Sequence, residues 1–245
     1  MSDLGGSMAD VIANINRNLE AKKEIEKQTE ILNFGHVRTD EEKAYYAEQI
    51  KRAEIEEKAR KEREKAEINA KAEFEKWNKT VPKKYKNASF ANADKNTPKE
   101  RAVVAFIEKC KSAILCGPNG VGKTYLGYAA CSKLIKQGKT AYLITAYKMF
   151  REIKRRFSTN TDEEYRTYLK NLDLLVVDEA DKKYGSVTDF LNLCEIISDR
   201  EAEELPTIIM TNADPDDLGE VLGKAVLDRV ASAGKIIEMD WESKR

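Results

Sequence analysis

Residues 117–124 form a glycine-rich segment that ends in a lysine and a threonine. The segment reads Gly-Pro-Asn-Gly-Val-Gly-Lys-Thr, and it lies between the apolar run Ser112–Cys116 and a stretch with helical periodicity. Glycines let the backbone fold into a turn whose N–H groups face an anion, and the start of the next helix adds a favourable dipole. Lys123 could neutralise phosphate charge, and Thr124 could ligate Mg²⁺. We therefore predict a triphosphate-binding turn rather than a turn without a ligand.

Two adjacent carboxylates follow a second apolar run. Asp178 and Glu179 come directly after residues 172–177, LDLLVV. A carboxylate at the end of a strand beside the glycine-rich turn can hold the water shell of Mg²⁺, as a Walker B aspartate does. The next carboxylate can polarise water for attack on the terminal phosphate. An ordinary pair of turn residues is the alternative, and the neighbouring motif makes it the weaker one.

A third apolar run, Thr207–Met210, ends in the polar pair Thr211-Asn212. A polar side chain at this position can orient water between Glu179 and the terminal phosphate. A strand inserted between the strands that carry the glycine-rich turn and Asp178 separates the chain from simple nucleotide kinases and GTPases. Asn212 could instead only cap a turn, but beside the other two motifs we interpret it as a sensor of the terminal phosphate.

Two arginines could contact the nucleotide of a neighbouring copy. Arg229, in VLDRV, is predicted to lie beyond the last helix and before the final strand, too far along the chain for an obvious role in its own site. Such a side chain could stabilise charge on a neighbour's terminal phosphate. A local pair with Asp228 is the alternative, which spacing alone favours. Arg200, at the end of a predicted helix, is a weaker candidate of the same kind.

The segment 148–157, KMFREIKRRF, predicts a basic helix with aromatic residues at both ends. Three apolar side chains, Phe150, Ile153 and Phe157, share one face. The cations Lys148, Arg151 and Arg155 lie on another. Cations beside an exposed ring can bind single-stranded nucleic acid through phosphate contacts and base stacking. A solvated basic face over a core stripe is an equally good interpretation. The candidate DNA contacts are Arg151, Arg155, Arg156 and Phe157.

Apolar runs and helical patterns alternate from Thr97 onward. Thr97-Pro98-Lys99-Glu100 predicts a helix that starts at a capping box. Strands are predicted at 112–116, 140–145, 172–177, 207–210 and 235–239. Helices are predicted between them at 123–137, 146–157, 161–169 and 187–200. The alternation predicts an α/β fold with a five-stranded parallel sheet covered on both faces.

The N-terminal part has a different character. Residues 1–34 predict a short amphipathic helix from Met8 to Leu19, which could dock on the following domain or bind a partner protein. Residues 35–78 predict a long charged helix that opens with a capping box at Thr39 and carries opposite charges four residues apart, such as Glu57 and Lys61. We interpret it as a solvated strut rather than a coiled coil. Residues 79–245 would form the nucleotide-binding domain.

Composition excludes some classes of protein. Acidic and basic residues balance at 43 each, so net charge indicates no partner, and 35% charged residues agrees with a solvated extension. No apolar run is long enough to span a bilayer, and the N-terminus lacks a signal-peptide core, so we expect a soluble, cytoplasmic protein. The cysteines show no CxxC spacing, and two of them, Cys116 and Cys131, fall in predicted core segments. We expect reduced packing residues and no zinc site.

From about Trp77 to Arg245, the chain resembles the DnaC/DnaI group of bacterial and phage replicative-helicase loaders, which are relatives of the IstB transposition ATPases. The resemblance is carried by WNKTVPKKYKNASFANAD, GPNGVGKTYL, LDLLVVDEAD, TIIMTNA, LGKAVLDRV and the closing WESKR. It implies an AAA+ P-loop ATPase domain without a C-terminal helical lid, preceded by a helical N-terminal extension. The lack of a cysteine-rich zinc module favours the DnaC-like form. Thr188 departs from the DnaC-like pattern, which can carry an aromatic there.

The resemblance also implies ligands and residue roles. ATP and Mg²⁺ would bind, with Thr124 and Asp178 at the metal, and Glu179, Asn212 and Arg229 would be catalytic, the last of them in a neighbour's site. Phe157 and Ser186 match positions implicated in contacts to single-stranded DNA, and Phe90 would pack near the adenine. The nucleotide-binding residues would be Gly117, Asn119, Gly120, Val121, Gly122, Lys123, Thr124, Tyr125, Asp178 and Phe90.

The function that the resemblance implies is ATP-dependent loading of a hexameric, DnaB-type replicative helicase onto single-stranded DNA. The N-terminal region would grip the helicase, and subunits would associate through their ATP sites. One alternative is an IstB-like transposition ATPase, which would need a transposase and double-stranded DNA. Another is a phage or plasmid antagonist that occupies the helicase with little need for ATP. Both a phage and a host origin are compatible with the sequence.

Overall fold

The computed structural model describes residues 23, 27, 39–180 and 186–244. The chain divides into two compact units, residues 1–68 and 69–245. The predicted amphipathic helix at 8–19 lies outside the described residues. Within the described part of the chain, no helix is both long and apolar enough to cross a membrane.

Helix α2, Asp40–Thr80, begins at the predicted capping box. The backbone N–H of Glu42 donates to Thr39 Oγ1, and the N–H of Thr39 donates to Glu42 Oε2, both at 3.1 Å. Lys61 and Glu57 form the predicted ion pair at 3.2 Å. From Asp40 to Ile68, no residue of the helix is buried. From Asp40 to Ile68, α2 therefore presents a charged, solvated surface, as the sequence predicts.

The last turns of α2 belong to the second unit. Ala70 is buried, and the side chains of Phe74 and Trp77 pack against the hydrophobic core of that unit. The boundary between the units therefore falls after Ile68, before the predicted boundary at residues 78 and 79, because these apolar residues continue the core along the helix.

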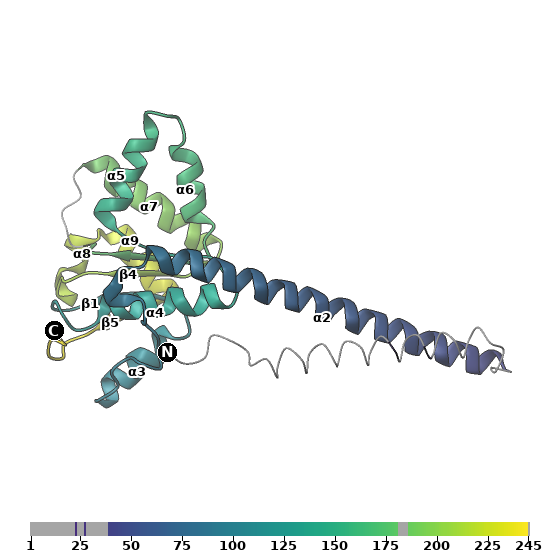
Figure 1. Ribbon diagram of the computed structural model, residues 1–245. Coiled ribbons are helices and arrows are strands. Elements are labelled where there is room, and N and C mark those ends of the chain that lie inside the picture. The colour runs from purple at the N-terminus through teal and green to yellow at the C-terminus, as the bar shows by residue number, and fades with distance from the viewer. Residues whose placement is uncertain (1–22, 24–26, 28–38, 181–185, 245) are drawn as a thin grey trace. The chain divides into compact units, whose positions relative to one another are not determined.

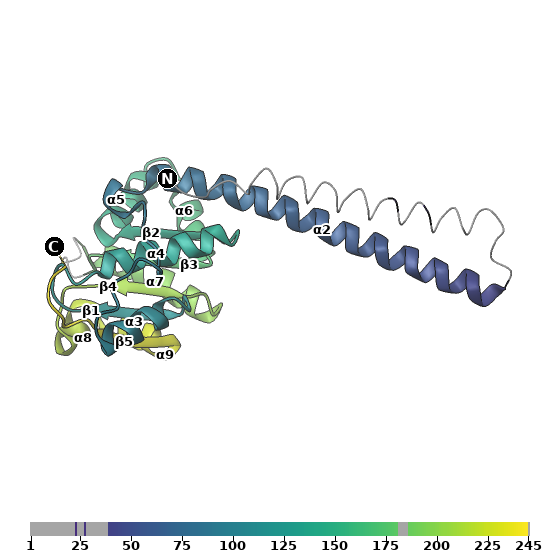
Figure 2. The same cartoon turned by 60° about the horizontal axis from the view of Figure 1, so that its bottom comes forward.

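The second unit is built around a five-stranded parallel sheet (Figure 1) with strand order β2-β3-β4-β1-β5, which the labels of Figure 2 follow. The strands are β1 Ser112–Cys116, β2 Ala141–Thr145, β3 Leu174–Asp178, β4 Thr207–Met210 and β5 Gly234–Glu238. Each lies within two residues of its predicted start and end. Strand β4 separates β1 from β3, as predicted from the position of the third apolar run. The predicted α/β fold is confirmed.

Helices cover both faces of the sheet, as Figures 1 and 2 show from two directions. Alternate residues of β1 serve two cores: Ala113 and Leu115 face one, and Ile114 and Cys116 face the other. The first core is covered by α3 Pro98–Ile107 and α4 Lys123–Lys136. The second is covered by α5 Ala146–Phe157, α6 Asp162–Lys170, α7 Val187–Ala202, α8 Leu218–Val221 and α9 Lys224–Ala233. Because both faces are buried, the central strands are continuously apolar.

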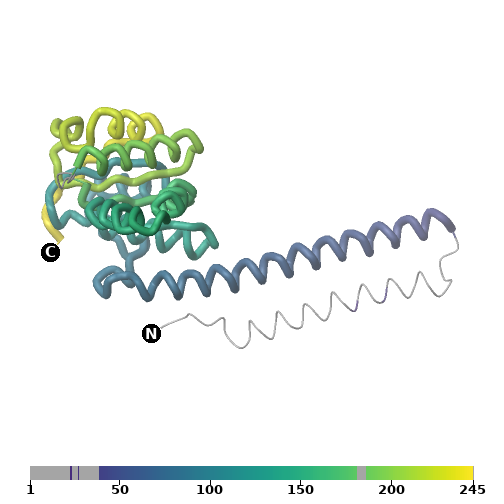
Figure 3. The backbone as a smooth tube through the Cα atoms, turned by 90° about the horizontal axis from the view of Figure 1, so that it is seen from above, coloured from purple at the N-terminus to yellow at the C-terminus, as the bar shows by residue number. Residues whose placement is uncertain are grey.

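Short elements and caps complete the unit. The predicted capping box of α3 forms, with Thr97 N donating to Glu100 Oε2 at 2.8 Å and Glu100 N to Thr97 Oγ1 at 3.1 Å. The elements that sequence patterns did not predict are η1 Lys83–Tyr85, η2 Pro215–Asp217, α8 and α9. After β5, a tail of residues 239–244 leaves the sheet, drawn in yellow up to the C-terminal label in Figure 3.

Two of the four cysteines, Cys116 and Cys131, were predicted in core segments, and both lie in the core. Cys116 and Cys131 are fully buried, and all four cysteines, including Cys110 and Cys194, are free thiols. Burial raises the pKa of Cys116 and Cys131, so both thiols stay protonated at neutral pH.

Candidate nucleotide-binding site

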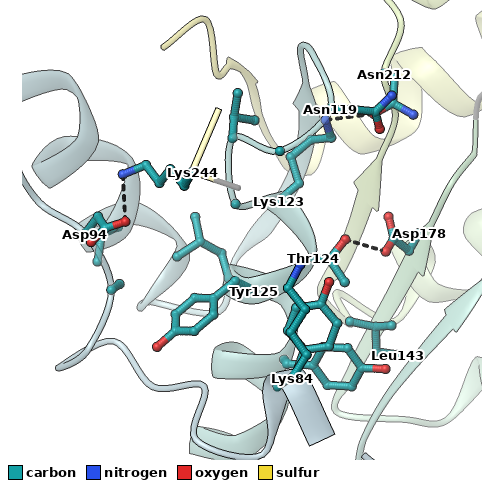
Figure 4. Close-up of a pocket in the computed structure, with 18 of the residues that line it drawn as sticks. Lys84, Asp94, Asn119, Lys123, Thr124, Tyr125, Leu143, Asp178, Asn212 and Lys244 are labelled. Atoms are coloured by element: carbon teal, nitrogen blue, oxygen red, sulfur yellow. Dashed lines mark hydrogen bonds and ion pairs between the residues drawn. The ribbon is translucent and has the colours of Figure 1, made fainter. Parts of the chain in front are cut away.

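A cavity of about 450 Å³ lies at the carboxyl edge of the sheet, around the N-terminus of α4 (Figure 4). Its walls come from the glycine-rich turn, from the ends of β2, β3 and β4, from the segment before α3 and from the C-terminal tail. In open parallel sheets, ligands bind outside the carboxyl ends of the strands, where connections diverge to opposite faces. This is the place at which the predicted phosphate-binding turn and carboxylates were expected to meet.

The glycine-rich turn has a backbone that demands glycine. Gly117 has φ +126°, and a Cβ atom there would lie 2.4 Å from Met239 O, inside contact distance. Gly122, with φ +104°, is the N-cap of α4 and lies in the left-handed region. Since α4 begins at Lys123, the unpaired N–H groups of its first turn and the positive end of its dipole are available to an anion. Residues 119–125 line the cavity.

Lys123 joins the turn to the end of β4. Its Nζ atom donates to Gly117 O at 2.6 Å, to Pro118 O at 2.9 Å and to Asn212 Oδ1 at 3.0 Å. Its side chain is buried, although it carries a charge. When a nucleotide binds, this ammonium can replace these oxygen acceptors with phosphate oxygens, because charged phosphate oxygens are the stronger acceptors. The structure thus brings Lys123 and Asn212 together, as the sequence predicts.

Thr124 and Asp178 meet in the same cavity. The Thr124 hydroxyl donates to Asp178 Oδ2 at 2.8 Å, and the backbone N–H of Glu179 donates to Asp178 Oδ1 at 2.8 Å. Burial raises the pKa of Asp178, and these two hydrogen bonds oppose that shift. A bound cation would relieve the cost of burying this carboxylate.

The oxygen pair of Thr124 and Asp178 fits Mg²⁺. Magnesium usually takes one or two protein oxygens and completes its shell with water and substrate phosphates. Among the residues that the structure describes, no cluster of three or more His, Cys, Asp or Glu side chains could hold a metal without such help. The donor set therefore suits a cation that arrives with a triphosphate.

Glu179 adopts a strained backbone beside this pair. Its φ is +53°, in the left-handed region that non-glycine residues rarely occupy. The residue is half-buried and lines the cavity. Such strain costs about 1–3 kcal/mol and persists where the surrounding structure enforces it, often at functional sites. Here Asp178 and the bond from Ala180 N to Met210 O, at 3.0 Å, hold the bend on both sides.

The rest of the cavity wall includes residues that sequence patterns did not identify. Tyr85 and Tyr128 stack with ring centroids 4.8 Å apart, and burial raises the pKa of Tyr128 to about 12, so it stays neutral. Figure 4 shows Asp94 and Lys244 on the opposite side of the turn from Asp178 and Asn212. The additional lining residues are Lys84, Tyr85, Asn92, Ala93, Asp94, Tyr128, Leu143, Thr145, Trp241 and Lys244.

Two residues predicted near the nucleotide have different surroundings. Tyr125 lines the cavity, and its hydroxyl donates to Ser89 O at 3.3 Å. Phe90 does not line the cavity: it is 6% exposed and packs in the core, with Lys133 Nζ 6.0 Å from its ring centroid. Asn92 and Ala93, two and three residues further on, face the cavity instead.

Comparison with known proteins agrees with this geometry. The model of the family described as "IstB-like ATP binding protein" matches residues 21–245. The chain belongs to this family. Among curated proteins, it is 30% identical over 146 residues to the replicative helicase loader DnaC of Escherichia coli strain K12, covering 58% of this chain and 60% of that one. It is 28% identical over 173 residues to DnaC of Buchnera aphidicola subsp. Baizongia pistaciae, covering 66% of this chain and 70% of that one.

Solved structures show the same fold. A crystal structure of DnaI superposes with a TM-score of 0.58 at 26% identity, covering 67% of this chain and 94% of that one. The DnaC helicase loader gives a TM-score of 0.58 at 22% identity, covering 64% and 99%. AMPPCP-bound DnaA of Aquifex aeolicus also gives 0.58, at 18% identity, covering 63% and 50%, a likeness in fold alone. The second unit of this IstB-family chain is an AAA+ P-loop domain.

The two arginine candidates differ sharply. Arg229 lies inside α9, not beyond the last helix as predicted, because residues 224–233 form a helix that sequence patterns missed. It is half-buried, its Nη1 donates to Ala225 O at 3.1 Å, and it does not line the cavity of its own chain. The suggestion that Arg200 acts on a neighbouring copy is wrong. Arg200 is 0% exposed, and its guanidinium is bonded within the core.

The predicted basic helix is α5, and it presents two exposed rings, Tyr147 and Phe157. Phe150 and Ile153 lie in the core as predicted for the apolar face, and Phe150 is only 6% exposed. Phe157 was predicted on the same face, but it is 71% exposed, because it is the last residue of α5. Of the two aromatic residues predicted to flank the cations, only Phe157 could therefore stack on a base. Ser186 lies at the N-cap of α7, where its hydroxyl accepts from Asp189 N at 3.3 Å.

The cations of α5 are held by neighbouring side chains. Arg155 Nη2 and Arg156 Nε contact Glu152 Oε1 at 2.7 and 2.8 Å, and these bonds lower the pKa of Glu152 to about 2. Arg151 lies over the Tyr147 ring, 5.9 Å from its centroid. The cations are thus spread along an exposed surface, but Glu152 offsets part of their charge.

Proposed function

We propose that this protein is an ATP-dependent loader that places a hexameric, DnaB-type replicative helicase on single-stranded DNA, with ATP as the switch. One observation carries the nucleotide part of this proposal: Lys123, Thr124, Asp178 and Asn212 converge in one cavity through bonds of 2.8–3.0 Å. The identity to curated replicative helicase loaders supports the loading part. The chain spans 60% of the length of the Escherichia coli relative, so its helicase partner, its DNA and its self-association are proposals.

Each residue of the cavity has a chemical task in this proposal. The N–H groups of residues 119–125 bind the phosphates, and Lys123 gives up its acceptors to neutralise the terminal two. Thr124 and Asp178 hold Mg²⁺, which would neutralise developing phosphate charge when bound. Glu179 accepts a proton from the attacking water, and Asn212 orients that water. Because Asn212 already bonds Lys123 Nζ at 3.0 Å, arrival of a terminal phosphate would reorganise both side chains together.

We also propose that neighbouring copies of the chain contribute to the ATP switch. Arg229 does not line its own cavity, and a role on a neighbour's terminal phosphate is compatible with its position on α9. Phe157 and the cations of α5 would contact single-stranded DNA, with Ser186 beside them. The N-terminal region would hold the helicase. Hydrolysis would then reset the complex.

Loading by purified protein tests this function. The wild-type protein is expected to co-purify with a replicative helicase and to transfer it to single-stranded DNA in ATP, while Lys123→Ala should still co-purify but fail to load. A truncation for mapping the helicase contact should remove residues 1–38 only, since Ala70, Phe74 and Trp77 belong to the core of the second unit. Loss of co-purification on this truncation would assign the contact to residues 1–38.

Other outcomes would favour the alternatives. Capture of a transposase with double-stranded DNA, and of no helicase, would indicate an IstB-like transposition ATPase, which the family match keeps in view. Helicase binding with loading unaffected by Lys123→Ala would indicate an antagonist that scarcely uses nucleotide.

A further inference from the structure

The C-terminal tail, residues 239–244, bonds directly to the phosphate-binding turn. Trp241 Nε1 donates to Val121 O at 2.9 Å, and the backbone N–H of Lys244 donates to Gly120 O at 2.9 Å. Both acceptors are carbonyls inside the turn. The tail itself is anchored to the sheet, because Met239 N donates to Cys116 O at 2.8 Å at the end of β1.

These two bonds determine where the N–H groups of the turn point. A trans peptide unit is planar, so its C=O and N–H groups point in opposite directions. The carbonyl of Gly120 shares a peptide unit with the N–H of Val121, and the carbonyl of Val121 shares one with the N–H of Gly122. With both carbonyls turned toward the tail, the two N–H groups are turned away from it.

Lys244 is itself held by two carboxylates. Its Nζ contacts Glu100 Oε1 at 2.5 Å and Asp94 Oδ2 at 3.2 Å, and Figure 4 shows the pairing with Asp94. Glu100 is 4% exposed and also caps α3 through Thr97 N. The side chain of Lys244 is 23% exposed. The Lys244 ammonium therefore holds the tail against α3. In this position the backbone N–H of Lys244 can donate to Gly120 O.

We propose that the C-terminal tail presets the anion-binding turn, with Trp241 and Lys244 as positioning residues for the phosphates. Trp241 acts through its indole N–H, and Lys244 acts through the ammonium that anchors its backbone. The free chain then holds the Val121 and Gly122 N–H groups in the binding orientation before phosphate arrives. The inference deepens the proposed nucleotide site and rests on it.

The two side chains can be tested separately in the full-length protein. Trp241→Phe keeps an aromatic ring and removes the N–H donor, and Lys244→Met keeps the stem and removes the ammonium. Lys244→Arg restores a cation, and Glu242→Gln changes an exposed neighbour on the same tail. Affinities for Mg·ATP, inorganic tripolyphosphate and adenosine are measured by competition against a fluorescent ATP analogue, and melting curves confirm that each variant is folded.

Loss of one hydrogen bond should weaken binding about fivefold. Trp241→Phe and Lys244→Met are expected to lose this factor for ATP and for tripolyphosphate but not for adenosine, which has no phosphate. Lys244→Arg and Glu242→Gln should bind like wild type. The inference is overturned if both loss variants bind ATP as tightly as wild type. It is also overturned if their affinity for adenosine falls by the same factor, because the tail would then contact the base rather than position the phosphate-binding turn. Should one variant fail to fold, the other decides.

The wild-type and Lys123→Ala proteins separate this inference from the proposed function. Wild-type binding that Lys123→Ala abolishes upholds the nucleotide site, whatever the tail variants do. A wild-type protein that binds neither ATP nor tripolyphosphate would overturn the nucleotide site and the inference with it.

Discussion

Replacing Arg200 by methionine should destabilise the second unit strongly while leaving the surface unchanged. The guanidinium is 0% exposed and donates five hydrogen bonds over 2.6–3.0 Å. Burial lowers its pKa to about 10, which still leaves it charged at neutral pH. Its acceptors are Leu169 O, Lys170 O, Leu172 O, Pro206 O and Thr207 Oγ1. One cation therefore joins the end of α6 to the segment that enters β4.

The magnitude follows from those acceptors. A buried acceptor left without a donor costs about 1–3 kcal/mol, so five of them could cost about 5–15 kcal/mol. Burying the guanidinium opposes folding of the wild-type protein by several kcal/mol of desolvation free energy. The methionine variant avoids this penalty, which offsets part of the loss. The difference is expected to be about 3–5 kcal/mol, the range for breaking a buried charged network. At this size of unit, that corresponds to a melting point lower by about 6–20 °C.

Urea unfolding followed by circular dichroism measures this loss. Arg101→Met is the matched control, because Arg101 is exposed and donates to Lys95 O and Asn96 O at 3.0 and 3.3 Å. The control should change the unfolding free energy by no more than about 0.5 kcal/mol. Equal unfolding midpoints for the two variants would refute the reasoning, and would return Arg200 to the candidates for a contact between copies.

Three further predictions concern the site and its surroundings. Asp178→Asn removes the carboxylate charge beside Thr124, so ATP affinity measured in Mg²⁺ should fall about 10- to 100-fold, toward the affinity measured in EDTA. If Mg²⁺ still increased the ATP affinity of this variant as much as that of the wild type, the metal assignment would be contradicted. Arg229→Ala should keep the unfolding midpoint but reduce ATP hydrolysis in the helicase-bound assembly about 10³-fold, and full activity there would exclude a role on a neighbour's phosphate. Arg155→Glu with Arg156→Glu should weaken binding of labelled single-stranded DNA in ATP and reduce the log–log salt slope by about 1.4, whereas unchanged affinity would exclude this surface.

The sheet and the centre of the site were predictable from local patterns. The central strands β1, β3 and β4 are short apolar runs bounded by polar or glycine residues, and parallel strands buried on both faces produce such runs. Lys123, Asp178 and Asn212 each follow one of these runs, so any parallel arrangement brings them to the same edge. Their convergence is a consequence of topology, and topology was indicated by the alternation of strands and helices.

Helix α9 and Arg200 show where local patterns fail. Helix α9 begins after Gly223, and only Val226 and Val230 of its residues are buried, a pattern too short to stand out. Missing this helix misplaced Arg229. Arg200 resembled an exposed charge at a helix end, because its neighbours in sequence, such as Asp199 and Glu201, are also charged. Four of its five acceptors are backbone carbonyls, and these leave no trace in the sequence.

The part of the cavity wall formed by the segment before α3 and by the C-terminal tail could not be predicted from local patterns, for a related reason. Lys244 pairs with Glu100 across 144 residues, and Trp241 bonds Val121 across 120 residues. Tyr85 and Tyr128 come from η1 and α4, and they meet only when the segment before α3 folds over the first core. Family resemblance drew attention to the SFANAD and WESKR segments. Only the fold shows which of their side chains face the cavity.

A crystal structure of the full-length protein with Mg²⁺ and a non-hydrolysable ATP analogue tests the central claim most directly. We expect the triphosphate at residues 117–124, with Lys123 Nζ and Asn212 turned to its terminal phosphate and the metal beside Thr124 and Asp178. A turn that stays empty at saturating analogue, or an analogue bound away from Lys123, would contradict the account.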